Sequence, residues 1–173
     1  MTAPTTDKYS AGEQGLGYIY QARLALLHML QLSEDTAVFL EKDDDLDFID
    51  GDGGKSLASL KHKAVGDRLT DLSIDFWKSV NIWLARYKRD GRAASNLRFF
   101  LFTTGEVSTA SFLARLLPKK PVASDDVATL TELANAALAE SVSQLIARIA
   151  SAFNELSDPE KQDFLERILI LDG

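Results

Sequence analysis

The hydrophobic period of the chain changes near residue 35, and this change constrains the fold more than any other feature. From about Glu13 to Leu32, apolar residues recur at helical spacing, and Ala, Leu and Gln favour a helix. Three short β-prone runs follow, "TAVFLEK", "LDFID" and "SLASLKH", and the glycine-rich "DGDGG" separates the second from the third. We therefore predict a helix and then an antiparallel meander of three strands, with a tight turn at Asp50–Gly54.

The rest of the chain alternates helical and strand patterns. A helix is expected from about Ser73 to Asp90, with Ser73 as N-cap and Gly91 after its end. Its predicted buried stripe consists of Leu72, Phe76, Val80, Trp83 and Tyr87. The run "LRFFLFTTG" predicts a buried central strand, and "STASFLARLLP" a short helix that ends before Pro118.

The C-terminal third is alanine-rich and predicts helix from Asp125 to Leu156, in one piece or two. Ser157 and Glu160 then form a capping-box pattern, and an apolar strand, "LILDG", ends the sequence. These elements predict an α/β (α+β) fold, a small mixed sheet flanked by helices with a helical C-terminal part. We expect residues 1–10 to be a disordered lead and 11–173 one domain, the N-terminal part of a longer protein.

Composition excludes several classes of function. The chain of 173 residues has no cysteine, so disulfides, thiolate zinc sites and thiol nucleophiles are ruled out. Its net charge of −7 argues against a general nucleic-acid coat, which needs lysine and arginine at phosphates. No apolar run approaches membrane-spanning length, and the N-terminus lacks the order of a signal peptide. We expect a cytoplasmic protein that contacts no membrane.

The stretch "EKDDDLDFIDGDGGKSLASLKHK", Glu41 to Lys63, allows three interpretations. A helix–loop–helix calcium loop that starts at Asp43 would need glycine sixth and glutamate twelfth, where the chain has Phe48 and Gly54. A phosphate-binding loop that ends in "GGKS" would need glycine at Ile49 and a helix afterwards, whereas the following residues alternate like a strand. Neither pattern is met.

The third interpretation is a metal-dependent nuclease site. If the meander is right, Asp45 at one strand end lies beside Lys61 on the neighbouring strand, and Glu41 adds a further oxygen. Magnesium prefers such oxygen ligands, and a nearby lysine stabilises charge on an attacking water or on the phosphate. The alternative is that Asp43, Asp44, Asp45 and Asp47 form a solvated acidic turn.

The order of several motifs adds a resemblance. "GLGYIYQARLALLHML", "VFLEKDDDLDF", "LKHK" and "LTDLSIDFWKSVNIWL" follow one another over residues 12–105. In this the chain resembles the N-terminal nuclease domain of bacterial antiphage effectors, namely cyclic-oligonucleotide-activated endonucleases and antiviral STAND ATPases. Such domains are similar to restriction endonucleases of the PD-(D/E)XK class. The resemblance implies magnesium-dependent cleavage of double-stranded DNA with little sequence preference, with manganese as a possible substitute metal.

The resemblance also implies roles for individual residues. Asp45 is the motif aspartate and a metal ligand, Lys61 the motif lysine and Glu41 a second metal ligand. Gln21, in the first helix, supports a water or a metal ligand from behind. The chain departs from the motif at Ser59, where glutamate, aspartate or glutamine is expected two residues before the lysine. This departure puts cleavage in doubt more than it does the fold.

Candidate DNA contacts lie just after the motif lysine and at the end of the helix expected from Ser73 to Asp90. Lys63 and His62 come directly after the motif lysine, although a solvated lysine and a packed or surface histidine are the alternatives. The basic run "RYKRDGR" contains Arg86, Lys88, Arg89 and Arg92, and Lys119 and Lys120 extend this candidate phosphate surface. The alternative for this run is a solvated helix end, favourable at the negative pole of the helix dipole. His28 is expected in the core, and Trp77 and Trp83 in the core or at an interface.

Three functional hypotheses result from these patterns. The first is a DNA endonuclease domain that works as a homo-oligomer under the control of a sensor or ATPase domain in the natural chain. The second is a catalytically silent scaffold that binds DNA or mediates assembly, with Ser59 marking the lost site. The third is a helical interaction domain with an acidic turn, which would show no change of melting temperature with magnesium.

Overall fold

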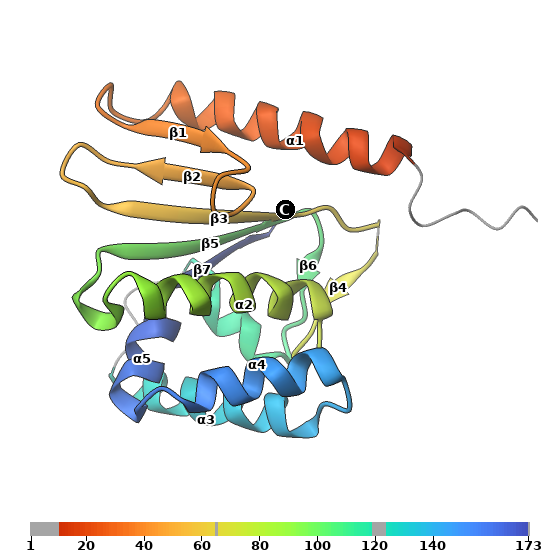
Figure 1. Cartoon of the computed structure of the whole chain (residues 1–173). Helices are drawn as coiled ribbons and strands as arrows, with labels where there is room; N and C mark the ends of the chain where they lie inside the picture. Colours follow the sequence, from red (N-terminus) through yellow and green to blue (C-terminus); the bar gives the residue numbers. More distant parts are fainter. Residues whose placement is uncertain (1–10, 65, 119–123, 173) are drawn as a thin grey trace, which may run out of the picture.

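The computed structural model describes residues 11–64, 66–118 and 124–172. It has the mixed α/β fold that the sequence predicts (Figure 1). Its N-terminal half contains α1 (Ala11–Met29), β1 (Ala37–Leu40), β2 (Leu46–Ile49), β3 (Lys55–Lys61), β4 (Arg68–Leu69) and α2 (Ile74–Arg89). The 3₁₀ turn η1 (Arg92–Ala94), β5 (Leu97–Thr103), β6 (Glu106–Val107) and the 3₁₀ helix η2 (Phe112–Leu116) follow. The chain then forms α3 (Ser124–Glu140), α4 (Gln144–Asn154), α5 (Asp158–Glu166) and β7 (Ile168–Asp172).

The main sheet has five strands in the order β1-β2-β3-β5-β7. The first three form the predicted antiparallel meander, with Leu46 opposite Ala58. The predicted turn closes it: Asp50 and Gly54 are hydrogen-bonded across the loop, and Gly53 has a φ of 84°, which suits glycine. Strands β3, β5 and β7 are parallel, and α2 crosses over between β3 and β5. A second sheet pairs β4 with β6, and the sequence patterns did not predict it.

Two apolar clusters lie on opposite faces of the sheet. The larger one joins α2, α3, α4 and α5 to the sheet and includes the stripe Phe76, Val80, Trp83 and Tyr87. The smaller one lies under α1 and contains Ala25, Leu46, Phe48 and Ala58. In Figure 1, α1 lies beside β1, and α2 lies between the sheet and the C-terminal helices. The half-buried His28 ring lies between Phe48 and Phe102, and burial lowers its pKa.

Two predictions about burial were wrong. The strand "LRFFLFTTG" is β5, and it is a central strand as predicted, paired with β3 on one side and β7 on the other, but only one of its faces is fully buried. Arg98 on β5 is exposed and Phe100 is only half-buried, because α1 covers that face of the sheet in part. Leu72 is 43% exposed rather than buried with the stripe, because it precedes the first turn of α2.

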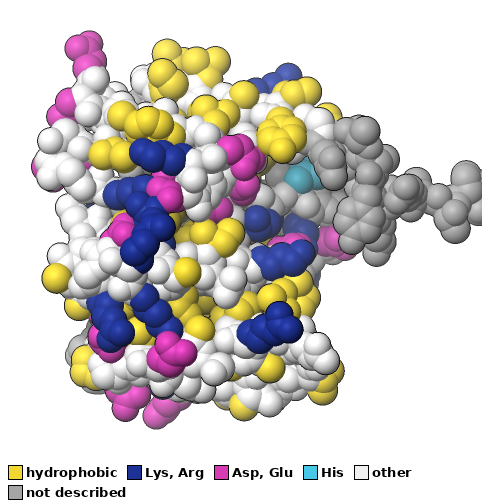
Figure 2. All heavy atoms as spheres, in the orientation of Figure 1, with side chains coloured by type: hydrophobic (Ala, Val, Ile, Leu, Met, Phe, Trp, Pro, Cys, Tyr) yellow, Lys and Arg dark blue, Asp and Glu magenta, His cyan; other side chains and the backbone are white. Residues whose placement is uncertain are grey.

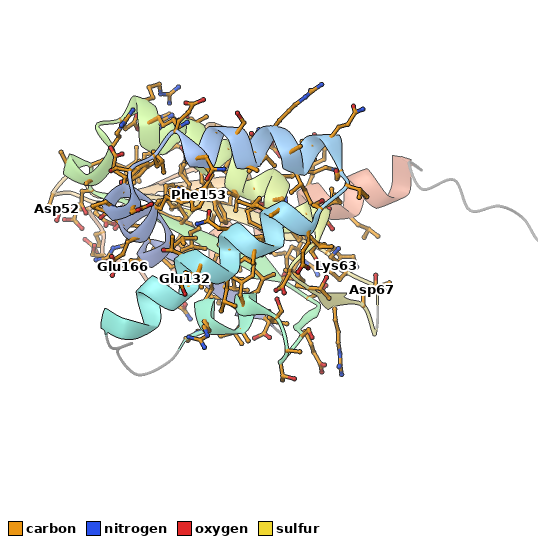
Figure 3. All side chains as sticks on the ribbon, turned by 90° about the horizontal axis from the view of Figure 1, so that it is seen from below. Asp52, Lys63, Asp67, Glu132, Phe153 and Glu166 are labelled. Atoms are coloured by element: carbon orange, nitrogen blue, oxygen red, sulfur yellow. The ribbon has the colours of Figure 1, made fainter. Side chains whose placement is uncertain are left out.

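None of the helices within the described part of the chain is both long and apolar enough to cross a bilayer. The side-chain view in Figure 3 shows the molecule from below. Lys63 and Asp67 lie at one end, and Asp52 and Glu166 lie at the other. The labelled Phe153 of α4 lies within the body of the molecule, and it is 2% exposed.

The predicted capping box at α5 is confirmed and gives a pH prediction. A Glu160 carboxylate oxygen accepts hydrogen bonds from the Ser157 backbone N–H (2.8 Å) and hydroxyl (2.9 Å), and Arg92 pairs with the other oxygen. Arg92 and then Ser157 hold the pKa of Glu160 at about 2. Because the folded pKa lies below the unfolded one, Glu160 stabilises the fold above pH 4.5 and loses this effect as pH falls towards 2.

We therefore expect Glu160→Gln to destabilise the protein at neutral pH and to approach the stability of the wild type only as pH falls to about 2, as measured by urea unfolding. An equal difference between the two proteins at both pH values would contradict this.

Candidate metal and phosphate site

A buried carboxylate shapes the acidic loop between β1 and β2. Asp47 is fully buried, and its Oδ1 atom accepts hydrogen bonds from the backbone N–H groups of Asp43 (3.3 Å) and Asp44 (3.2 Å). Its Oδ2 atom lies 2.8 Å from the ammonium of Lys55, which also pairs with Asp43. Lys55, the lysine of "GGKS", is therefore a structural cation at the start of β3, and no helix follows it as a phosphate loop would require.

The two aspartates before Asp45 also have protein partners. Although burial opposes it, hydrogen bonds from Lys55 and Arg86 hold the pKa of Asp43 at about 2. Asp44 is 8% exposed and accepts hydrogen bonds from the Trp83 indole (2.6 Å) and the Asp45 N–H (2.9 Å). Burial raises the pKa of Asp44 to about 6, against the opposing effect of these donors. The alternative of a wholly solvated acidic turn is wrong, because the loop is tied to α2 and β3.

Asp45 meets two other predicted site residues at the end of this loop. The Gln21 side-chain nitrogen on α1 lies 2.7 Å from Glu41 Oε1 and 3.1 Å from Asp45 Oδ1, so one amide group joins both carboxylates. Glu41 has a φ of 52°, which is uncommon for a residue with a side chain. The Gln21 oxygen is buried and has no hydrogen-bond partner in the described residues.

The second carboxylate oxygen of Asp45 faces β3. It accepts a hydrogen bond from the Leu60 N–H at 2.6 Å and lies 3.7 Å from the Lys61 ammonium. Ser59 is fully buried, and its hydroxyl lies 3.5 Å from the same oxygen and accepts a 2.8 Å hydrogen bond from Ser79 on α2. The structure thus brings together Gln21, Glu41, Asp45, Ser59 and Lys61.

Two carboxylates and one amide oxygen could together hold a divalent cation. No group of three His, Cys, Asp or Glu side chains converges within the described residues, so carboxylates alone do not form a metal site there. Gln21 supplies the missing oxygen. Its NH₂ group now points at both carboxylates, and rotation of the amide would point its unpartnered oxygen at them instead. A cation between Glu41 and Asp45 would then have three oxygen ligands, with water completing its coordination.

Lys61 and Lys63 connect this site to the start of α2. Lys63 pairs with Asp75 at the start of α2. Although burial opposes it, this pair and the charges of Lys78 and Lys61 hold the pKa of Asp75 below its usual value. Asp75 therefore lies within the influence of three lysines, one of which, Lys61, also lies 3.7 Å from Asp45. Sequence patterns missed Lys78, because its influence on Asp75 joins the site only once α2 packs against β3.

The other predicted DNA contacts have partners within the protein. His62 is exposed, with its ring 6.5 Å from that of Tyr20. Arg86 pairs with Asp43 and Asp90, and Arg89 with the same two acids. Two further ion pairs in the run join Lys88 to Glu155 and Arg92 to Glu160. DNA contact by the basic run would have to replace these pairs and stays a prediction, and Lys119 and Lys120 lie outside the described residues.

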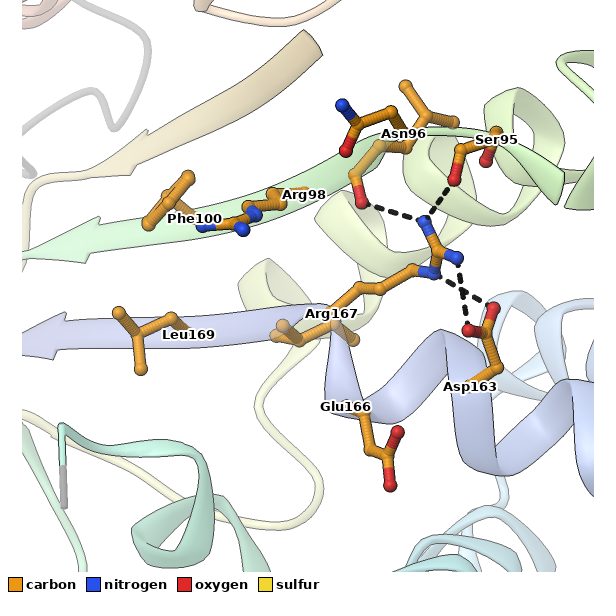
Figure 4. A pocket seen from close by; sticks show the side chains of 10 residues that line it. Ser95, Asn96, Arg98, Phe100, Asp163, Glu166, Arg167 and Leu169 are labelled. Atoms are coloured by element: carbon orange, nitrogen blue, oxygen red, sulfur yellow. Dashed lines mark hydrogen bonds and ion pairs between the residues drawn. The ribbon is translucent and has the colours of Figure 1, made fainter. Parts of the chain in front are cut away.

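A cleft of about 500 Å³ lies at the start of β5 and β7. Figure 4 shows Arg167 within it, donating to the backbone oxygens of Ser95 and Leu97 and pairing with Asp163. Arg167 thus fastens α5 to the start of β5. Glu166, which also lines the cleft, lies at the opposite end of the molecule from Lys63 (Figure 3), so the cleft is separate from the candidate site.

Comparison with known protein families, with curated proteins and with solved structures finds no match to this chain.

Proposed function

We propose that this chain is a metal-dependent endonuclease domain that cleaves double-stranded DNA with little sequence preference. The observation that supports this most is the meeting of Asp45, Glu41 and Gln21 with the Lys61 ammonium, 3.7 Å from Asp45. Oxygen ligands next to a lysine and among further lysines suit a phosphodiester, whose charge needs cations on both sides. The motif resemblance extends the proposal to an effector of antiphage defence.

The residues divide the work of hydrolysis. Magnesium, or manganese in its place, would be held by Asp45, Glu41 and the Gln21 oxygen, and when bound would polarise the phosphate and acidify a water. The Leu60 N–H fixes one oxygen of Asp45 and so orients the carboxylate. Lys61 orients the attacking water and stabilises the negative charge that develops in the transition state. Lys63 and Lys78 hold the neighbouring phosphates of the strand.

The wider setting is part of the same proposal. Cutting both strands takes two sites, so the domain acts as a homo-oligomer in the cytoplasm. A sensor or ATPase domain elsewhere in the natural chain would switch it on.

The test is plasmid cleavage with magnesium, with magnesium and excess EDTA, and with Lys61→Ala. We expect wild-type protein to nick and linearise the plasmid only with free metal, and Lys61→Ala to lose at least about 100-fold in rate. Lys42→Ala is the matched control, because this exposed lysine lies over the ring of Phe39. Equal cleavage by wild type and Lys61→Ala would remove the catalytic proposal.

Ser59 supports a second candidate, a silent scaffold that binds DNA. Its hydroxyl is neutral and already hydrogen-bonded to Ser79, so it is a weak replacement for a carboxylate ligand. We expect the double variant Ser59→Glu and Ser79→Ala, in which the smaller alanine makes room for the carboxylate, to cleave about tenfold faster or more if Ser59 merely weakens metal binding. If neither the wild type nor the double variant cleaves DNA, and the wild type still binds it, the result would favour the scaffold.

A further inference from the structure

The outer side of α1 is apolar although it faces solvent. Five large side chains on α1 and the turn after it are between 49% and 79% exposed. They are Leu16, Ile19, Leu26, Leu27 and Leu30, and we call them the outer stripe. At 100° per residue they fall within about 100° of the helix circumference. The opposite side carries Gln21 and Ala25, which are buried against the sheet.

The area of this surface approaches that of a stable interface. Figure 2 shows hydrophobic side chains gathered over the region of α1 and β1. On the edge strand β1, Leu40 is paired with Leu46, on the face of the sheet that α1 covers, and it is 49% exposed. With the outer stripe Leu40 presents on the order of 600 Å² of apolar surface, at the upper end of what a typical monomer leaves in one patch and approaching the roughly 800 Å² that each partner buries in a standard interface.

The charge distribution points to a protein partner rather than a lipid surface. Between Gly15 and Ser33 the one residue with a formal charge at pH 7 is Arg23. Membrane-surface helices have polar faces rich in lysine and arginine, whereas the other face of α1 is packed on the sheet. The chain has a net charge of −7, so two copies repel each other except where they meet over uncharged surface.

The spacing of the outer stripe fits a second copy of itself. Leu16, Ile19, Arg23, Leu26 and Leu30 follow the alternating three- and four-residue spacing at which paired helices interlock. In a twofold pair the same patch meets itself, so residues near the axis contact their own copies. If the twofold axis passes near Leu26, the two helices run antiparallel, and each Arg23 lies opposite the end of the partner helix that carries its Leu30. The long Arg23 side chain can reach solvent there, away from the other Arg23.

We propose that the outer stripe of α1 pairs with the outer stripe of a second copy of this chain, with Leu26 near the twofold axis and β1 at the margin. The inner side of the same helix holds Gln21 against Glu41 and Asp45, so the pair joins two candidate sites through one pair of helices. The use of this pair for cutting both strands rests on the proposed function. The pairing itself does not.

The experiment measures molar mass by sedimentation equilibrium at micromolar protein concentration, without metal or DNA. We expect the mass of two chains of 19.0 kDa for wild type. Leu26→Lys should weaken association at least about tenfold. The matched control is Val142→Lys, between α3 and α4, where the side chain is fully exposed and the substitution should leave the dimer intact. A wild-type monomer, or equal association of both variants, would overturn the proposal.

A second measurement avoids dependence on the charged variant. The chain has no cysteine, so Leu26→Cys introduces a single thiol. Mild oxidation should crosslink this variant to a disulfide dimer and leave Val142→Cys uncrosslinked. Absence of the crosslink in Leu26→Cys, or equal crosslinking of both variants, would overturn the geometry. Because neither assay uses cleavage, a dimer that fails to cut DNA would count against the proposed function alone. A monomer that cuts would count against the pairing alone.

Discussion

Replacing Asp45 with asparagine should reduce magnesium-dependent DNA cleavage by about 10²- to 10³-fold. Asparagine keeps the size of the side chain and removes its charge. In the wild type one oxygen faces Gln21 at 3.1 Å, and the other faces Leu60 N–H at 2.6 Å and Lys61 at 3.7 Å. The variant would hold a divalent cation weakly, because a full negative charge is lost from a site with two carboxylates.

The measurement is the initial rate of plasmid nicking at several magnesium concentrations. Asp67→Asn is the matched control, since this exposed aspartate lies at the same end of the molecule as Lys63 (Figure 3). Melting temperatures in metal-free buffer would show that both variants are folded. Undiminished nicking by Asp45→Asn would contradict the assignment of the metal site.

Trp83→Ala should cost about 3 to 5 kcal/mol in the free energy of unfolding. The Trp83 side chain is fully buried, and its ring stacks on Phe99 with centroids 5.5 Å apart. Its indole N–H also donates to the buried carboxylate of Asp44 at 2.6 Å. Truncation leaves a cavity in the larger core and an acceptor without its donor, and both effects destabilise the folded state.

Urea unfolding followed by circular dichroism measures this change. Trp83→Phe retains most of the packing and removes the indole N–H. Its loss of stability, about 1 to 3 kcal/mol, therefore measures the hydrogen bond to Asp44 apart from the effect of the cavity. Ile82→Ala on the same helix is the control, because that side chain is 40% exposed and should cost under about 1 kcal/mol. A loss below about 1 kcal/mol for Trp83→Ala would contradict the packing described above.

Local patterns were sufficient for most elements of the fold. The helical period predicted α1 and α2, and alternation with the glycine turn predicted the meander of β1, β2 and β3. The capping box at Ser157 was visible because both partners lie within one helical turn. The central position of β5 was predicted, but its parallel neighbours β3 and β7 and the pairing of β4 with β6 were not, because strand order depends on contacts between distant segments.

The candidate site could be predicted in part. Acidic residues before a strand and a lysine at the end of the next strand suggested that Asp45 and Lys61 meet, and they do. The burial of Asp44 by Trp83, the contact of Ser79 with Ser59 and the lysines around Asp75 were missed. Each of these involves α2, whose position against β3 is set by packing of the whole core.

The amino-acid sequence by itself determined what is local: the helical and strand periods, the glycine turn, the caps and the chemical types available for a metal site. Tertiary structure alone decided which side chains share that site, which cations are neutralised by carboxylates and which face of α1 faces solvent. The physical reason is that periodicity is a property of neighbouring residues. Burial, ion pairing and proximity across the sheet arise from the packing of segments that lie far apart in the chain.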